Sequence, residues 1–557
     1  MAIADFIKQK LNRPDLTPKL WTAWREGYRF ADFKADFVAG LTVAIVALPL
    51  SMAIAIASNA SPAVGLKTAF VAGFWISVLG GSRHQIGGPT AAFAIVVANI
   101  IGQFGMDGLV LATLMAGLIL MAAAIFRLGA FLKYVPHPVV IGFTSGIAVT
   151  IFITQIGAFF GLSTTGNPTE IIERLNAYWH AIGTINPSTV AVSLFSLFII
   201  VLFRRLKPHW PYFLIAVVAT SIAAIMLHLP IETVGHKFGE IKTTIPDIVF
   251  PSVTFSRLQA LLPSALTIAF LAGIESLLSA VVADGMTGRH HRSNAELLGQ
   301  GFANIMSAIS GGLPATGAIA RTATNIRAGA KTPISGILHA VLLLLMLLVA
   351  GKLTAFIPLA TLAAILMVVA WNMAEIDRVI RLFRFSATSD RVILLTTFGL
   401  TVFADLTVAV EAGIVLSAIM FMHHMSDNTE ITDTSEEEVG NTRANLPNGV
   451  ETFRIRGPLF FGAAGSFVDA IERIDTPPTA FILNMEEVPF IDAAGIAALL
   501  DVIGKLRKSK TTLIITGLRP NARKQLAKVR ATTSQMAGVR YAANDANALN
   551  IIEQGMP

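Results

Sequence analysis

The sequence has 557 residues, of which 54% are hydrophobic and only 14% are charged. Soluble proteins average about 25% charged residues, so this composition predicts a chain that lies mostly within a lipid bilayer. The formal net charge of +7 is explained by the basic cytoplasmic loops of a membrane protein more simply than by a nucleic-acid partner. The lack of cysteine excludes disulfides, thiolate metal sites and cysteine nucleophiles.

Residues 1–35 are polar and mixed in charge. They predict an amphipathic, cytoplasmic N-terminal segment, because the first apolar run begins too late for a cleavable signal peptide. Residues 36–426 alternate between apolar runs and short polar breaks, and they are predicted to form the transmembrane domain. A membrane span needs about 20 apolar residues. Fourteen spans are predicted, at residues 37–58, 63–80, 89–102, 108–127, 138–161, 187–203, 211–228, 262–284, 295–310, 317–328, 334–351, 357–373, 390–404 and 407–425.

The third and tenth predicted spans are too short to cross a bilayer, and each follows a segment broken by glycine and proline. These segments are residues 85–92 (QIGGPTAA) and 311–318 (GGLPATGA). Irregular backbone at membrane depth persists only where it is buried in protein or lines a cavity. Positions three and ten are equivalent if the chain is two inverted repeats of seven spans. The two half-helices are then expected to meet near the midplane, with their N-termini pointing inward.

Basic residues are concentrated in alternate gaps between the predicted spans, for example at Arg83, Arg204 and Arg289. The intervening gaps hold acidic residues such as Asp107 and Glu170, with few basic ones. Basic gaps face the cytoplasm in membrane proteins. Because the number of spans is even, the sequence predicts that both termini are cytoplasmic.

The character of the chain changes after the last predicted span. Residues 427–448 are acidic and rich in serine and threonine, which predicts a solvated linker. Residues 449–557 alternate between short strand-like and helical patterns, which predicts a small cytoplasmic α/β domain. The expected strands are 451–457, 458–462, 480–485 and 511–517, and the expected helices are 493–508 and 520–530.

Several stretches carry a family resemblance. They are ADFVAGLTVAIVALPLSMAIAIAS (35–58), GGSRHQIGGPTAAF (80–93) and residues 275–336, which begin ESLLSAVVADGMTGRHHRSNAELLGQGFANI and end GGLPATGAIARTATNIRAGAKTPISG. The chain resembles the SulP (sulfate permease) family of anion transporters, whose relatives include prestin and pendrin. The C-terminal PLFFGAA and IDAAGIAAL (491–499) resemble the STAS domain of that family. The bacterial members that look similar include the proton-coupled C4-dicarboxylate carrier, and the chain resembles that branch closely.

The resemblance implies a fold and a cellular location. The fold would be an α-helical membrane protein with a 7+7 inverted repeat, of the uracil-permease (UraA-like) type, in which a core domain slides against a gate domain. A homodimer in the bacterial inner (plasma) membrane would be expected. In related STAS proteins a serine is phosphorylated where this chain has Ala494. A phosphorylation switch is therefore not expected here, and the domain is predicted to be a scaffold or docking surface for a cytoplasmic protein partner.

The two broken segments supply the candidate anion site. Helix N-termini carry free N–H groups and a partial positive charge, so two converging half-helices can bind an anion without many basic side chains. The competing interpretation is that the segments are simple kinks. Gln85 precedes the first segment, and its amide could contact substrate or satisfy broken backbone. The candidate substrate-binding residues are Gln85, Thr90, Ala91, Gly317, Ala318, Ile319, Ala320 and Arg321.

Glu275 and Ser279 are the candidate ion-coupling residues. A carboxylate inside an apolar span is costly and marks a functional site by default. A carboxyl group removed from water takes up a proton more readily, so Glu275 can couple transport to protons. Ser279 lies one helical turn later and leaves a sodium site open. The alternative is a structural ion pair between Glu275 and Arg321.

These features predict a secondary active transporter of small anions, with no resident cofactor and no metal site. A C4-dicarboxylate, sulfate and bicarbonate are the candidate substrates, and coupling to protons is favoured over coupling to sodium. A sodium-coupled bicarbonate symporter and an anion exchanger remain alternatives. A nucleobase permease and an anion-sensing or scaffolding protein that acts through the STAS domain are further alternatives. Enzymatic activity is not predicted, because no nucleophile–base or metal constellation is present in the sequence.

Overall fold

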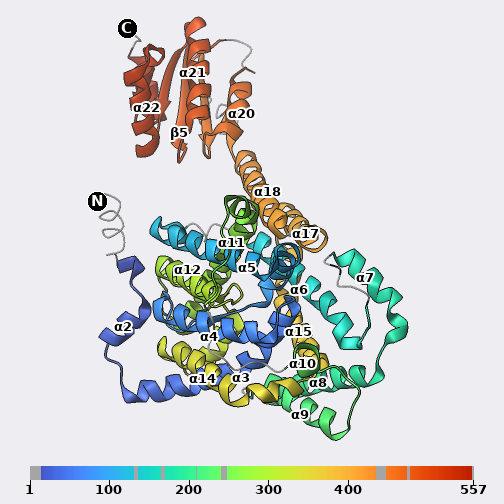
Figure 1. Cartoon of the computed structure of the whole chain (residues 1–557). Coiled ribbons are helices and arrows are strands. Elements are labelled where there is room, and N and C mark those ends of the chain that lie inside the picture. Colours follow the sequence, from blue (N-terminus) through green and yellow to red (C-terminus); the bar gives the residue numbers. More distant parts are fainter. Residues whose placement is uncertain are drawn as a thin grey trace. The chain divides into compact units, whose positions relative to one another are not determined.

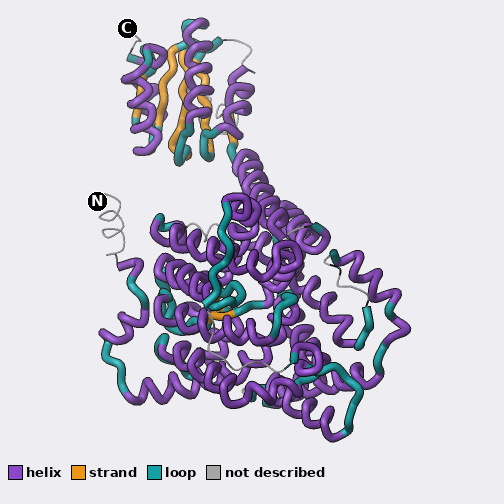
Figure 2. Tube along the Cα trace, in the orientation of Figure 1, coloured by secondary structure: helices purple, strands orange, loops and turns teal. Residues whose placement is uncertain are grey.

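The structure is a computed structural model that describes residues 14–130, 136–164, 168, 170–207, 210–239, 248–404, 406–433, 447–472 and 477–554. The chain divides into two compact units, Met1–Ile414 and Val415–Pro557. In its described residues the first unit is helical apart from two short strands, whereas the second contains a five-stranded sheet (Figure 2).

Every predicted span coincides with a helix (Figure 1). Nine helices of the described residues are long and apolar enough to cross a membrane. Proline and a side-chain cap mark some of the starts: Pro187 opens α8, and the Asn186 side chain accepts from the backbone of Ser188 and Thr189. The helices that coincide with the predicted spans are α3 (Phe30–Ala57), α4 (Pro62–Leu79), α5 (Ala94–Ile125), α6 (His137–Phe160), α8 (Pro187–Leu206), α9 (Tyr212–Met226), α11 (Phe255–Thr287), α12 (Ser293–Ile309), α13 (Ile319–Arg327), α14 (Ile334–Ala350), α15 (Leu359–Met373), α17 (Thr388–Phe403) and α18 (Leu406–Asp427).

Most of the third and fourth predicted spans lies in α5, which is broken at Gly105. This residue has a φ of 69° and a ψ of −178°, a conformation that glycine adopts without the steric cost a side chain would add. Residues 94–104 therefore form a short helix before a longer one at 106–125. The other predicted short segment is α13, which has nine residues. Both half-helices are thus present where the sequence predicts them.

The most extensive helix contacts of the first unit fall within two groups, and fewer contacts, such as those of α3 with α15, join the groups. One group contains α3, α4, α5, α11, α12, α13 and α14, and the other contains α6, α8, α9, α15 and α17. The contacts also come in matching pairs when the first half of the chain is aligned with the second. The packing of α3 on α14 matches that of α11 on α5, and the packing of α4 on α14 matches that of α12 on α5. In the second group, α6 on α17 matches α15 on α8.

Four described α-helices of this unit lie outside the predicted spans. Each is short, and the last of them follows α15 and presents several basic residues. They are α2 (Lys19–Arg25), α7 (Ile171–His180), α10 (Val234–Phe238) and α16 (Ile376–Phe385).

The N-terminal segment packs against the loop that leads into the first broken segment. The Lys19 backbone N–H donates to the Gly80 carbonyl at 3.0 Å, and the Arg292 guanidinium donates to the Thr17 carbonyl at 2.9 Å. Glu26 forms an ion pair with Arg83. This hydrogen bond from Arg83 lowers the pKa of the Glu26 carboxyl. The segment therefore holds the loop on the side where α4 ends.

The second unit contains a sheet with the strand order β3–β4–β5–β6–β7. Strand β3 is antiparallel to β4, and the remaining neighbours are parallel, as alternating strands and helices predict. Helices α20, α21 and α22 cover one face through a core that includes Phe481 and Leu499, and α23 covers the other face through Ala548. The elements are β3 (Glu430–Asp433), β4 (Val450–Arg456), α20 (Phe461–Glu472), β5 (Ala480–Glu487), α21 (Ala493–Lys508), β6 (Thr512–Thr516), α22 (Pro520–Thr532), β7 (Arg540–Ala542) and α23 (Asp545–Glu553).

The strand predicted at 458–462 is wrong. Only Leu459 forms a bridge, with Ile491, and helix α20 begins at Phe461. Pro458 lacks the N–H that a ladder needs, and Gly457 turns the chain with a φ of 109°. The Phe461 N–H then donates to the Asp492 carboxylate at 3.1 Å. A carboxylate at a helix N-terminus stabilises the helix that starts here.

Candidate functional site

The two broken segments pair with each other at the centre of the first group of helices. Strand β1 (Gly87–Gly88) is antiparallel to β2 (Thr316–Gly317), with Gly87 opposite Gly317. The ladder continues where the Ala318 N–H donates to the Ile86 carbonyl at 2.8 Å. Figure 2 shows the pair as the short strands among the helices. Segments separated by more than two hundred residues therefore meet at one point, as the symmetry argument predicts.

Each strand leads directly into a half-helix. Thr90 is the N-cap residue of the turn Ala91–Phe93 that opens α5, and Ala318 is the N-cap residue of α13. Neither N-cap side chain bonds to the first turn of its helix. Ile319 and Ala320 are exposed at the start of α13. The two helix starts thus bring backbone N–H groups and partial positive charge to the same region.

Side chains satisfy the irregular backbone before β2. The Asn304 amide accepts from the Ala315 N–H at 2.9 Å and donates to the Ala315 carbonyl at 2.8 Å. The Leu313 N–H donates to Thr68 at 2.7 Å, and its carbonyl accepts from Ser307 at 2.6 Å. Backbone groups left unpaired at membrane depth would be costly, so these side chains are what permits the break.

Arg321 lies in the first turn of α13 and is buried. Its Nη2 donates to the Pro89 carbonyl at 2.8 Å, directly before Thr90. Its Nε and Nη1 have no hydrogen-bond partner among the described residues. Gly88 has a φ of 151°, which favours glycine, and a Cβ there would lie 2.7 Å from Nη1. Arg321 therefore links the two half-helices through one hydrogen bond, and its Nε and Nη1 donors are left for another acceptor.

Glu275 lies on α11 and is half-buried. Its Oε2 accepts a hydrogen bond of 2.9 Å from the Thr90 hydroxyl. In the described part of the chain no ion pair joins it to Arg321, which the alternative interpretation required. The predicted coupling residue and the predicted anion site are thus in direct contact through Thr90.

Ser279 faces α13 rather than Glu275. Its hydroxyl donates to the Thr322 hydroxyl at 3.1 Å, and the same Thr322 oxygen accepts from the Ile86 N–H at 3.1 Å. Thr322 was not among the predicted site residues. In the sequence, Thr322 is marked only by its hydroxyl and its position directly after Arg321.

Gln85 is buried against Gly317. Its Nε2 donates to the Ser276 hydroxyl at 2.7 Å and to the Ser276 carbonyl at 3.3 Å, while its Oε1 has no partner in the described residues. A Cβ on Gly317 would lie 1.7 Å from Nε2, so only glycine fits beneath the amide. Gln85 therefore braces α11 with its amide nitrogen and keeps a free acceptor.

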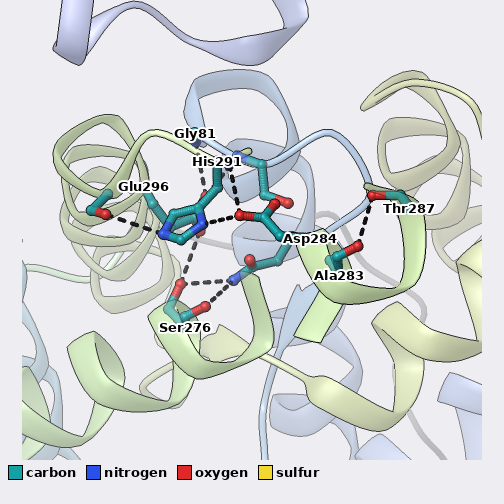
Figure 3. A network of polar contacts seen from close by, with 10 residues as sticks. Gly81, Ser276, Ala283, Asp284, Thr287, His291 and Glu296 are labelled. Atoms are coloured by element: carbon teal, nitrogen blue, oxygen red, sulfur yellow. Dashed lines mark hydrogen bonds and ion pairs between the residues drawn. The ribbon is translucent and has the colours of Figure 1, made fainter. Parts of the chain in front are cut away.

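A buried carboxylate that the sequence analysis did not single out supports this arrangement (Figure 3). Glu296 on α12 accepts from the Gly81 N–H at 2.8 Å, the Ser82 N–H at 3.1 Å and the Ser276 hydroxyl at 2.9 Å. It links the loop before β1 to the residue next to Glu275. An acid within a predicted apolar span was the signal available in the sequence. Nearby, His291 in the loop between α11 and α12 contacts Asp284, near the end of α11, at 2.7 Å.

Ala494 lies in the first turn of α21 in the second unit. The Asp492 side chain caps this helix by accepting from the Gly495 N–H at 2.8 Å. Ala494 therefore lies at a helix start and has no hydroxyl to modify.

Comparisons with known proteins place the chain in a family. The profile of the Sulfate permease family matches residues 33–397, and that of the STAS domain matches residues 441–535. The chain is 40% identical over 505 residues to the "Putative sulfate transporter YvdB" of Bacillus subtilis, covering 90% of this chain and 95% of that one. It is 30% identical over 524 residues to the "Bicarbonate transporter BicA" of Picosynechococcus sp., covering 90% and 91%.

The fold also matches a solved structure along most of its length. The murine Slc26a9 anion transporter in the inward-facing state aligns with a TM-score of 0.87 at 18% identity, covering 97% of this chain and 94% of that one. Identity at this level shows the fold alone. The matching fold, the family profile and the apolar helices together establish an integral membrane protein of a transporter family, not an enzyme. The chain belongs to the sulfate permease family of anion transporters and carries a C-terminal STAS domain.

Proposed function

We propose that this protein is a proton-coupled secondary transporter that binds a small anion between the starts of α5 and α13. The observation that carries the proposal is the contact of Thr90, at one helix start, with the Glu275 carboxylate. An anion bound at these N–H groups lies beside a carboxyl group, so loss of the carboxylate charge on protonation favours the anion. The sodium alternative would use Glu275 with Ser279, whose hydroxyl bonds to Thr322 here.

Sulfate and bicarbonate are the first candidate substrates, because they appear in the names of the relatives. A C4-dicarboxylate is a further candidate, and it rests on the sequence resemblance alone. A carboxylate or sulfate oxygen can accept from the helix-start N–H groups and from the unpartnered donors of Arg321. Gln85, Ala91, Gly317, Ala318, Ile319 and Ala320 complete the proposed site.

We also propose that the fourteen helical segments form a 7+7 inverted repeat. The matching contact pairs of the two halves support it, as does the antiparallel pairing of the two broken segments. The two helix groups then correspond to a core domain that holds the site and a gate domain. We further propose, from the charge pattern of the loops, that both termini are cytoplasmic. From the family resemblance we propose that the membrane is the bacterial inner membrane and that the protein is a homodimer whose STAS domain binds a cytoplasmic partner.

The function is tested by uptake in proteoliposomes. Labelled sulfate, bicarbonate and succinate are supplied with an inward proton gradient, with an inward sodium gradient, and with neither. We expect uptake of at least one anion that follows the proton gradient. Uptake that follows only sodium would favour the sodium-coupled symporter, and uptake that needs a counter-anion would favour an exchanger. No flux of any anion would favour a sensing or scaffolding protein.

A pair of glycine variants tests the location of the site. Gly317→Ala places a Cβ against the Gln85 amide and should lower uptake by about tenfold or more, as expected when an oriented contact is displaced. Gly285→Ala on α11 is the matched control, because nothing lies within 4 Å of its Cβ. Equal uptake by the two variants would place the anion elsewhere.

A further inference from the structure

We propose that the Thr90 hydroxyl couples proton binding at Glu275 to anion binding, by reversing the direction of its hydrogen bond. The inference deepens the proposed function and rests on it. It assigns to Thr90 a role different from that of a simple anion ligand. A change in one hydroxyl then transmits the protonation state of α11 to the start of α5.

The conformation of Thr90 points to this role. Its φ of −119° and ψ of 154° are those of an N-cap residue, whose side-chain oxygen ordinarily accepts from the second or third N–H of the helix. Thr90 makes no such cap bond. Its Oγ1 lies 2.9 Å from Oε2 of Glu275. The hydroxyl is therefore turned from its own helix toward the carboxyl group, and the N–H groups of the first turn are left without this cap.

The number of hydrogens decides the direction of the bond. An ionised carboxylate can only accept hydrogen bonds, so Thr90 must supply the hydrogen. The hydroxyl then has only lone pairs left, and it cannot donate to an anion. A protonated Glu275 carries an O–H that can donate to Oγ1 of Thr90. The hydrogen of Thr90 is then free to turn toward an anion beside the first-turn N–H groups.

The two states therefore differ in anion affinity. In the ionised state an anion meets the carboxylate charge and the lone pairs of the hydroxyl. In the protonated state that charge is gone, and one charge-assisted hydrogen bond is gained. Such a bond corresponds to about ten- to hundredfold in affinity. By linkage, the bound anion raises the proton affinity of Glu275 by the same factor.

Other charged groups near this part of α11 have their own contacts. Arg321 on α13 donates to the Pro89 carbonyl, and Glu296 on α12 is held by the Gly81 and Ser82 backbone. The remaining charged groups lie near helix ends, in the loop after α11 or, for Asp107, just after the break at Gly105 in α5. They are Asp284 with His291, Asp107 on α5 with Arg257 on α11, and Arg327, which is exposed at the end of α13. Thr90 is thus the polar contact through which Glu275 reaches the site in the described residues.

A double-mutant cycle tests the relay. Glu275→Gln places an amide donor beside Thr90 and imitates the protonated acid. Thr90→Val keeps the shape and removes the hydroxyl. Anion affinity is measured by calorimetry on the purified full chain at fixed pH, with whichever of sulfate, bicarbonate or succinate the wild type transports. We expect Glu275→Gln to raise affinity about tenfold or more with Thr90 present and by a clearly smaller factor in the Thr90→Val background.

Proton uptake on anion binding gives a second measurement, made in weakly buffered solution. The wild type should take up protons when it binds the anion, Thr90→Val should take up fewer, and Thr90→Ser should restore the wild-type value. Retained melting temperatures show that the variants are folded. An unchanged proton count in folded Thr90→Val, or an equal effect of Glu275→Gln in both backgrounds, would overturn the relay alone. A wild type that binds the anion without taking up protons would overturn the proton-coupled function as well.

Discussion

Replacing Glu275 by glutamine should uncouple transport from the proton gradient while leaving the anion site intact. The variant keeps the size of the side chain and can donate to the Thr90 hydroxyl, which bonds to Glu275 in the wild type. It cannot gain or lose a proton in the working range. The helix starts and Arg321 are untouched, so the substrate should still bind. Net accumulation should therefore fail although exchange persists.

The size of the effect follows from the driving force. A gradient of one pH unit is worth about 1.4 kcal/mol per proton, which corresponds to roughly tenfold accumulation of the anion for each proton coupled. Proteoliposomes with an inward gradient of this size should show that accumulation for the wild type, once the membrane potential is clamped. Glu275→Gln should equilibrate the anion without accumulation, and it should still exchange labelled for unlabelled anion. Full gradient-driven accumulation by this variant would refute the assignment of Glu275.

Three further predictions concern other parts of the chain. Arg321→Ala should weaken anion binding about ten- to hundredfold, because a charge-assisted donor is lost, and Arg321→Lys should weaken binding less. Normal anion binding by a poorly folded Arg321→Ala variant would instead show that Arg321 has a purely structural role. A cysteine at Lys237 should react with an impermeant thiol reagent from outside, and one at Arg384 should react only in inverted vesicles; the reverse pattern would invert the topology. Gly166, the other outside position predicted from the sequence, lies outside the described residues. Ala494→Ser should leave uptake within about twofold of wild type without an added kinase, and a large loss in unphosphorylated protein would contradict the docking role.

The positions of the membrane helices could be predicted because hydrophobic runs of span length are a strong local signal. Runs such as those of α3 and α14 need no tertiary information. Boundaries were less accurate: α3 begins at Phe30, ahead of the predicted residue 37, and Asp32 accepts from the Arg29 N–H at its start. A polar first turn of a helix does not lengthen the apolar run, so hydropathy alone cannot show where such a helix begins. The amphipathic helices α7 and α16 were missed for the same reason.

The two half-helices could be predicted from glycine, proline and symmetry, but the contacts around them could not. A carboxylate in an apolar run singled out Glu275 as a candidate, and its role stays a prediction. The direction in which each side chain points depends on tertiary packing. The Arg321 side chain bonds to Pro89 instead of Glu275, and Ser279 bonds to Thr322. Asn304 and Glu296 support the site from a neighbouring helix, and no spacing rule connects them to the segments that they hold.

The pairing of β1 with β2 limits what can change during a transport cycle. Separating the half-helices would expose backbone groups at membrane depth, where an unpaired N–H or carbonyl is costly. The two helix starts should therefore travel together, as one cradle that presents the same N–H groups to either side of the membrane. Such a cradle has no intrinsic preference for loading on one side. If the proposed proton coupling holds, the direction of uphill transport is set by the protonation of Glu275, which meets a different proton concentration at each face.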